Sequence, residues 1–246
     1  MHRVAPLGAL LEPLDPLILK KRVKVSVKVK ICGVRTPDVV EAAVAAGADY
    51  IGVVFFEKSP RNVTLAEAAL VTKAAAGRIA SVAVLVDPDD LLIEEVVAIA
   101  GPDLLQLHGR ERPERLADIK NRFGVPLIKA ISVASPEDAA EAHRFWDVAD
   151  MILFDAKPDP AATLPGGNGL AFDWHALAAV SQGRHFALSG GLTAENVGEA
   201  VRVTGATMVD VSSGVERVPG RKDRDLVRKF IQAAKSAAAT PKAIAS

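Results

Sequence analysis

The feature that most constrains this chain is a regular alternation of β-rich runs and helical patterns from Val23 onward, punctuated by turn residues. Such alternation predicts parallel strands joined by right-handed helical crossovers. Eight strands are predicted, at 23–33, 50–56, 80–86, 104–108, 126–132, 151–155, 185–189 and 207–212. A helix is predicted after each strand, at 37–46, 65–76, 89–100, 113–123, 136–146, 174–181, 194–204 and 222–236.

Residues with known end preferences flank these predicted helices. Thr36 and Ser135 each place a capping hydroxyl before a proline at the first helical position. Thr64 and Glu67 have the spacing of a capping box. Glycines stand where helices should stop, at Gly47, Gly77, Gly101, Gly124 and Gly205.

Eight such units in 246 residues predict an α/β fold, a single (β/α)8 TIM barrel with an irregular N-terminal extension. The alternative, an open doubly wound sheet, usually carries a G-x-G-x-x-G fingerprint in its first strand–helix turn, which Cys32–Thr36 lacks. Glycine-rich segments instead follow the last three strands, which favours the barrel. The expected organisation is an extension at 1–22, a catalytic barrel at 23–237 and a flexible tail at 238–246.

Composition argues against several classes of function. Lys plus Arg and Asp plus Glu number 30 each and aromatic residues make up 4%, so a nucleic-acid partner is not expected. The apolar stretch Val4–Leu19 is too short and too interrupted by prolines to span a membrane, and it lacks the features of a secretory signal. A single cysteine, Cys32, fits a reducing cytoplasm. No helix face is apolar enough to demand a partner, so we expect weak or no oligomerisation.

Four polar residues fall on the predicted lumen-facing side of strands, near the C-terminal ends where barrel active sites are built. They are Cys32, His108, Asp155 and Asp210. Each alone has a structural explanation: a free cysteine is often a small buried hydrophobe, and Asp210 could hydrogen-bond loop backbone. Their shared location favours one active site, because burying a carboxylate without a purpose is costly.

Three glycine-rich loops, after the sixth, seventh and eighth strands, predict a phosphate site. Backbone N–H groups of such loops cradle phosphate in barrels, and glycine lets the backbone approach the anion closely. The residues predicted to hold the phosphate are Gly166, Gly167, Gly190, Gly191, Ser212, Ser213 and Gly214.

The chain also resembles the phosphoribosylanthranilate isomerase family of tryptophan biosynthesis, in segments spread in order over nearly the whole chain. KICG, KSPR, QLHG and DVSSGVE are together specific for it. The matching segments are VKICGVRTPD (29–38), GADYIGVVFFEKSPRNV (47–63), LLQLHG (104–109), LFDA (153–156), PGGNGLAFDW (165–174), LSGGLTAENV (188–197) and VDVSSGVERVPGRKD (209–223).

The resemblance implies an Amadori rearrangement without metal or cofactor, from N-(5-phosphoribosyl)anthranilate to 1-(2-carboxyphenylamino)-1-deoxyribulose 5-phosphate. It implies that Cys32 is the general base and Asp155 the general acid. It further implies that Arg61 holds the anthranilate carboxylate and that His108 and Asp210 border the substrate. One departure is Leu170–Ala171, where relatives are often more polar.

This chemistry makes demands on the thiol. The base must reach the thiolate, so we expect nearby positive charge to lower the pKa of Cys32 below its usual value of about 8.5. Lys30, two residues earlier on the same strand face, is a candidate for that charge.

Three alternatives remain open. The related histidine-pathway isomerase uses an aspartate where this first strand ends in Cys32, and indole-glycerol-phosphate synthase needs a lysine–glutamate set that is not found here. A barrel that only binds a phosphosugar would be expected to have lost Cys32 or Asp155, and both are present.

Overall fold

The computed structural model describes residues 27–157, 172–181 and 183–237. The predicted extension at 1–22, the predicted tail at 238–246, and Gly166 and Gly167 lie outside the described residues. Within the described part, no helix has the length and apolarity needed to cross a membrane.

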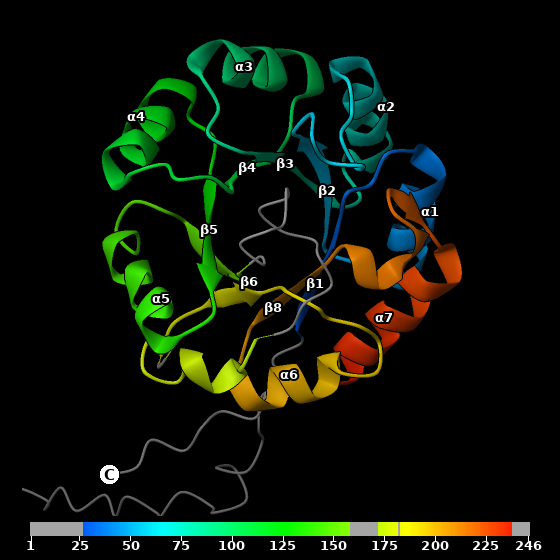
Figure 1. The fold of residues 1–246 in the computed structure, drawn as a ribbon. Helices are drawn as coiled ribbons and strands as arrows, with labels where there is room; N and C mark the ends of the chain where they lie inside the picture. Colours follow the sequence, from blue (N-terminus) through cyan, green and yellow to red (C-terminus); the bar gives the residue numbers. More distant parts are fainter. Residues whose placement is uncertain (1–26, 158–171, 182, 238–246) are drawn as a thin grey trace, which may run out of the picture.

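The eight strands form one closed parallel barrel in chain order, as predicted (Figure 1). The barrel closes where β1 pairs with β8, from Lys28 beside Met208 to Ile31 beside Val211. The strands are β1 (Lys28–Cys32), β2 (Tyr50–Phe55), β3 (Ala80–Leu85), β4 (Leu104–Leu107), β5 (Leu127–Val133), β6 (Met151–Ala156), β7 (Phe186–Leu188) and β8 (Met208–Val211).

The helices surround the barrel, and several are shorter than predicted. The segments predicted as helices at 89–100 and 136–146 change into a π turn and a 3-10 turn halfway, and the one at 174–181 is a 3-10 turn of four residues. The described helices are α1 (Pro37–Ala46), α2 (Leu65–Ala75), α3 (Asp90–Glu95), α4 (Pro113–Phe123), α5 (Pro136–Ala140), α6 (Val197–Thr204) and α7 (Arg224–Ser236).

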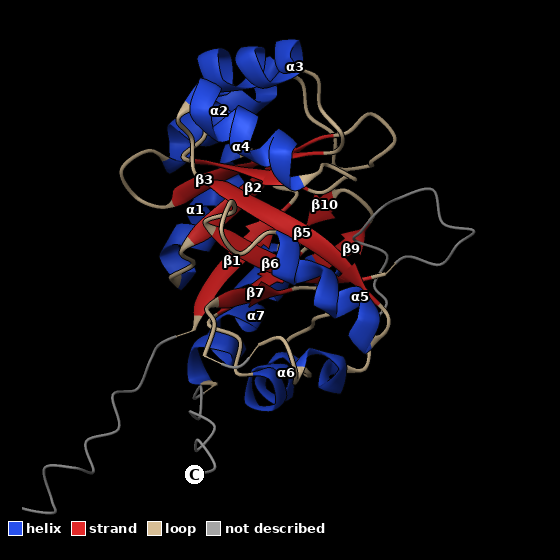
Figure 2. Ribbon diagram, turned by 90° about the vertical axis from the view of Figure 1, so that its left-hand side faces the viewer, coloured by secondary structure: helices blue, strands red, loops and turns tan. Residues whose placement is uncertain are grey.

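A small hairpin, which the sequence pattern did not predict, interrupts the last β/α connection. It consists of β9 (Glu216–Val218) and β10 (Arg221–Lys222). Figure 2 shows it beside the C-terminal ends of the barrel strands. The predicted start of the last helix at 222 was therefore wrong, because Lys222 belongs to β10 and Asp223 caps α7 through the N–H groups of Asp225 and Leu226.

Most of the predicted caps are confirmed. Thr64 and Ser135 each form a complete capping box. Thr36 occupies the N-cap position of α1 but makes no side-chain cap hydrogen bond, so its predicted capping hydroxyl was wrong. Left-handed glycines directly follow α1, the π turn, α4 and α6, at Gly47, Gly101, Gly124 and Gly205. The last residue of α2 is Ala75, its C-cap is Ala76, and its left-handed glycine, Gly77, comes one residue later.

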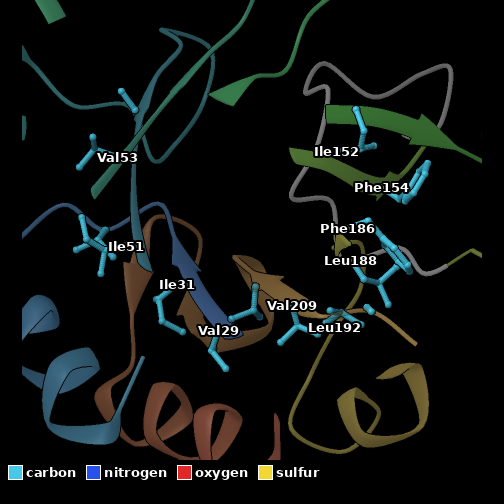
Figure 3. Close-up of a cluster of buried hydrophobic side chains, with 14 of the residues drawn as sticks. Val29, Ile31, Ile51, Val53, Ile152, Phe154, Phe186, Leu188, Leu192 and Val209 are labelled. Atoms are coloured by element: carbon cyan, nitrogen blue, oxygen red, sulfur yellow. The ribbon is translucent and has the colours of Figure 1, made fainter. Parts of the chain in front are cut away.

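The strands divide their side chains between two apolar layers, as the predicted alternation requires. Val29 and Ile31 of β1 and Val209 of β8 belong to the large cluster between strands and helices (Figure 3). A second cluster, including Leu153 and Met208, fills the part of the lumen near the N-terminal ends of the strands. The polar residues of the lumen face lie closer to the C-terminal ends of the strands than this apolar layer does. A polar site can therefore form only at that end of the barrel.

Three aspartates at the opposite end of the barrel tie neighbouring strands together. Asp49, Asp103 and Asp150 each directly precede an even-numbered strand. Their carboxylates accept the backbone N–H of Val29 (2.8 Å), Ser81 (2.7 Å) and Leu127 (2.8 Å). Each bond therefore locks the start of one strand to the residue before the next, which stabilises the register of the barrel.

Replacing Asp103 with alanine should destabilise the fold without changing the chemistry. The backbone N–H and the hydroxyl of Ser81, which is 2% exposed, both lose their acceptor. We expect a loss of about 1–3 kcal/mol in the free energy of unfolding, measured by urea denaturation, with kcat unchanged. The matched control is Asp118→Ala, at an exposed carboxylate of α4. Equal unfolding midpoints for the two variants would contradict this role of Asp103.

Candidate active site

One pocket opens at the C-terminal ends of the strands. It brings together residues of β1, β4, β6 and β8 with the loops after β2, β7 and β8. All of the predicted site residues that the structure describes line it: Cys32, Arg61, His108, Asp155, Gly190, Gly191, Asp210, Ser212, Ser213 and Gly214.

Cys32 ends β1 and shares its surroundings with the ammonium group of Lys30. The two residues lie on the same strand face, over Gly52 of β2, which pairs with Cys32. A methyl group on Gly52 would lie 3.1 Å from Sγ of Cys32 and 3.1 Å from Nζ of Lys30. The absence of a side chain at residue 52 therefore provides the space that the thiol and the ammonium occupy.

The predicted lowering of the thiol pKa is wrong. Burial raises the pKa of Cys32, and the charge of Asp210 adds to that effect. The positive charges of Lys30 and Lys222 act in the lowering direction but do not outweigh burial. Positive charge near the thiol is present as expected, but the desolvation that opposes it could not be read from the sequence.

Lys30 and Asp210 form a buried ion pair across β1 and β8. Nζ of Lys30 lies 3.1 Å from each carboxylate oxygen, and the two side chains are 0% and 5% exposed. Burial works against the charge of Lys30, but Asp210 and Cys32 outweigh it and raise its pKa. Asp210 lines the pocket, and among the described residues its oxygens bind Lys30 rather than loop backbone.

Asp155 is the penultimate residue of β6 and lies next to His108, which follows β4. Oδ1 of Asp155 accepts the N–H of Ala156 at 3.0 Å, and Oδ2 lies 3.3 Å from Nε2 of His108. The other ring nitrogen of His108 lies 3.0 Å from the amide nitrogen of Gln106. An amide nitrogen can only donate, so in this arrangement Nδ1 of His108 accepts and Nε2 faces Asp155.

Gln106 is a pocket residue that sequence reasoning did not select. It is 1% exposed and lines the pocket, and its Oε1 has no hydrogen-bond partner in the structure. Gln106 lies two residues before His108, so strand alternation puts both on the same face, and the segment QLHG includes it. An amide does not titrate, so it gave no signal of acid–base chemistry.

Arg61 is anchored by Glu216 of the β9–β10 hairpin. Its Nε and Nη2 each lie 2.9 Å from a different oxygen of that carboxylate. Glu216 also accepts the ammonium of Lys222 at 2.7 Å and the N–H of Gly220 at 3.1 Å. Burial would raise the pKa of Glu216, but Arg61 and Lys222 lower it. These three side chains, two cations and one carboxylate, together carry one net positive charge.

Glu216 and Lys222 were likewise not selected from the sequence. Both lie within the matched segment 209–223, which is the signal that could have found them. Nothing in the local pattern indicates that an unpredicted hairpin brings them to Arg61, which is 155 residues from Glu216.

The loops after β7 and β8, which were predicted to hold a phosphate, pack against each other beside the pocket. A methyl group on Gly190, which has φ +90°, would lie 2.5 Å from the backbone nitrogen of Ala156. One on Gly214 would lie 2.0 Å from the carbonyl oxygen of Leu192. Only glycine fits at these two contacts, so the loop after β7 lies close against the end of β6 and the loop after β8 lies close against the loop after β7.

Lys222 holds the loop after β8 in place. Its Nζ donates to the carbonyl oxygen of Ser212 at 3.0 Å and to its hydroxyl at 3.3 Å. The Ser212 hydroxyl in turn donates to the carbonyl oxygen of Cys32 at 3.2 Å. Burial lowers the pKa of Lys222, against the charge of Glu216. The Ser212 hydroxyl thus joins the loop after β8 to the end of the thiol-bearing strand, and Lys222 holds Ser212 in place.

Comparison with known proteins gives a consistent result. The family model described as N-(5'phosphoribosyl)anthranilate (PRA) isomerase matches residues 29–233. The N-(5'-phosphoribosyl)anthranilate isomerase of Parvibaculum lavamentivorans is 53% identical over 214 residues, which are 86% of this chain and 100% of that protein. That of Bradyrhizobium sp. is 53% identical over 212 residues, covering 86% and 97% of the two chains.

Solved structures agree with the sequence comparison. The phosphoribosyl anthranilate isomerase from Thermotoga maritima superimposes with a TM-score of 0.77 at 34% identity, covering 85% of this chain and 98% of that one. A structure of phosphoribosyl anthranilate isomerase in complex with reduced 1-(o-carboxyphenylamino)-1-deoxyribulose 5-phosphate has a TM-score of 0.74 at 33% identity, with the same coverage.

Proposed function

The chain belongs to the N-(5'-phosphoribosyl)anthranilate isomerase family, and we propose how the residues of its pocket carry out that family's reaction. The enzyme rearranges N-(5-phosphoribosyl)anthranilate to 1-(2-carboxyphenylamino)-1-deoxyribulose 5-phosphate in tryptophan biosynthesis. The roles of the individual residues below are our proposal.

One observation carries the proposal: a thiol from the end of β1 and a carboxyl group from the end of β6 line the same pocket. Asp155, as general acid, protonates the furanose ring oxygen, and the ring opens to a Schiff base. The Cys32 thiolate, as general base, then removes the proton from C2′ to give an enolamine. Tautomerisation returns a proton to C1′ and leaves the ketone. Each positioned acid–base group contributes on the order of 10²–10⁴-fold to the rate.

The cradle after β7 and β8 is the proposed phosphate site. Gly190, Gly191, Ser212, Ser213 and Gly214 line the pocket at that side, and their backbone N–H groups would bind the phosphate oxygens. The buried ammonium of Lys222 beneath Ser212 places positive charge close to that anion. Gly166 and Gly167 stay predictions for the same site.

Arg61 is the proposed partner of the anthranilate carboxylate. Its guanidinium lines the pocket while Glu216 fixes its plane, and a planar guanidinium binds a carboxylate with defined geometry. Val54, Phe56 and Val84 give the pocket an apolar wall that suits the aromatic ring of the substrate. His108 and Asp210 border the same space, His108 against the acid and Asp210 against Lys30.

A direct assay tests this function. The purified chain should convert phosphoribosylanthranilate to the carboxyphenylamino-deoxyribulose phosphate, followed by chromatography, and should restore growth of a tryptophan auxotroph lacking this step. Turnover of the histidine-pathway substrate in its place would support the alternative isomerase. Absence of turnover with both substrates would overturn the proposal. That the enzyme works in the cytoplasm and associates weakly or not at all stays a prediction.

Replacing Arg61 with methionine should raise KM much more than it lowers kcat. The fold should survive, because Glu216 keeps the ammonium of Lys222 and the N–H of Gly220. Losing a charged hydrogen-bond partner of about 1.5–3 kcal/mol corresponds to a KM increase of about ten- to a hundredfold. The control is Arg35→Met, at an arginine that does not line the pocket. A KM within twofold of wild type would remove Arg61 from substrate binding.

A further inference from the structure

The side chain of Lys30 is a fully buried cation inside the barrel. It is 0% exposed, although lysine is among the residues least often buried without a partner. Asp210 is one partner, with both oxygens at 3.1 Å. If Asp210 were its only neighbour, pairing with that carboxylate would be enough to explain why the ammonium of Lys30 is buried.

The ammonium has a second neighbour in the thiol of Cys32. Both groups lie at the same distance, 3.1 Å, from the point where a side chain of Gly52 would begin. The charge and hydrogen bonding of Lys30 act on Cys32 to lower the pKa of the thiol, and Cys32 acts on Lys30 to raise the pKa of its ammonium. Lys30 therefore stands between two groups that carry negative charge when ionised, Asp210 and Cys32.

Other charged groups near Cys32 are committed to other partners. Asp210 on β8 opposes the thiolate. Lys222 on β10 is held by Glu216 and by both oxygens of Ser212, and Arg61 is anchored by the same glutamate. Across the pocket His108 lies against Asp155.

We propose that Lys30 is a positioning residue whose ammonium stabilises the thiolate of Cys32, with Asp210 limiting that stabilisation by sharing the same charge. The proposal rests on the role of Cys32 as the base. It explains why a catalytic thiol in a desolvated position is placed two residues after a buried lysine. A Coulomb attraction acts over such a short distance with little screening where water is excluded.

The chain has one cysteine, which makes the thiolate measurable by itself. The rate of alkylation of Cys32 by iodoacetamide is followed against pH, since only the thiolate reacts. The midpoint of the curve reports the thiol ionisation, and the plateau at high pH reports access of the reagent. Dividing each rate by its plateau separates a change in ionisation from a change in access.

Lys30→Met and Asp210→Asn should move the midpoint in opposite directions. Without the ammonium, the normalised rate at pH 7 should fall about tenfold or more, since one pKa unit is a tenfold change in thiolate below the midpoint. Without the carboxylate, the ammonium serves the thiol alone and the normalised rate should rise. A midpoint in Lys30→Met equal to that of wild type, or shifts of the same sign in both variants, would overturn the proposal.

Two further variants keep the result interpretable if a lone buried charge prevents folding. Lys30→Met combined with Asp210→Asn removes both charges, and its midpoint should lie between those of the single variants. Lys28→Met removes an exposed lysine of the same strand and should leave the midpoint unchanged. Thermal unfolding followed by circular dichroism confirms that each variant is folded.

Turnover measured on the same variants separates this proposal from the function it rests on. A shifted alkylation midpoint with wild-type turnover would mean that the contact is real and that Cys32 is not the base. An unshifted midpoint, with turnover abolished by the loss of the thiol, would mean that Cys32 is the base and that Lys30 does not stabilise its thiolate.

Discussion

Cys32→Ala should lower kcat by at least about a hundredfold, because the variant has no group that can take the C2′ proton. The fold should be retained, since the thiol is small and borders the pocket beside Val54 and Val84. KM should change little, because the proposed contacts to phosphate and carboxylate come from other loops. Steady-state kinetics with phosphoribosylanthranilate measure both constants.

Cys32→Ser is the matched control for this result, since it keeps the size of the side chain and replaces the thiol by a far weaker acid. It should be as impaired as the alanine variant if the ionised form is what matters. Near-normal turnover in either variant would remove Cys32 from the mechanism.

The pH dependence follows from the direction of the thiol pKa. Burial raises the pKa of Cys32, so around neutral pH most molecules carry the thiol and the base is the minor, ionised form. The thiolate fraction increases tenfold per pH unit below that pKa. The kcat/KM of the wild-type enzyme should therefore rise with pH through the neutral range, and Cys32→Ala should lack this rise. A flat wild-type profile would contradict the assignment of the thiolate as base.

Asp155→Asn should also lower kcat by at least about a hundredfold, for the opposite reason. The amide keeps the shape of the side chain, and its oxygen can still accept the N–H of Ala156, which lies 3.0 Å from Oδ1 in the wild-type structure. It has no carboxyl proton to give to the ring oxygen, so ring opening loses its acid. Binding should be largely retained, because neither the cradle nor Arg61 depends on this carboxyl group.

The control for Asp155 is Asp118→Asn, which makes the same change at an exposed position of α4. It should have wild-type kcat and KM. A kcat for Asp155→Asn within a few-fold of wild type would point to another acid, and His108, 3.3 Å away, would be the first residue to test.

Much of the barrel was predictable because its signals are local. All eight strands lie within or overlap their predicted ranges, and α1 and α4 begin and end where predicted. Proline at the start and glycine at the end define these two helices without help from the rest of the molecule. The segments that were predicted wrongly or not at all have few such signals. The 3-10 turn Trp174–Leu177 follows an irregular loop, and the β9–β10 pair is too short to show a strand period.

The sequence by itself determined the alternation of strands and helices, the face of each strand that points into the lumen, and the end of the barrel at which Cys32, His108, Asp155 and Asp210 gather. These follow from side-chain period and from strand direction, which are properties of neighbours in the chain. Family resemblance added the chemistry those residues would perform.

Only the tertiary structure decided how the charges pair. Lys30 and Asp210 are 180 residues apart, and Arg61 and Glu216 are 155 apart, so no local pattern joins them. The tertiary structure also decided whether the pKa of Cys32 is raised or lowered, and on this point the sequence-based expectation was wrong. That direction is a balance between desolvation and several charges, and both depend on burial and distance, which exist only once the barrel has closed.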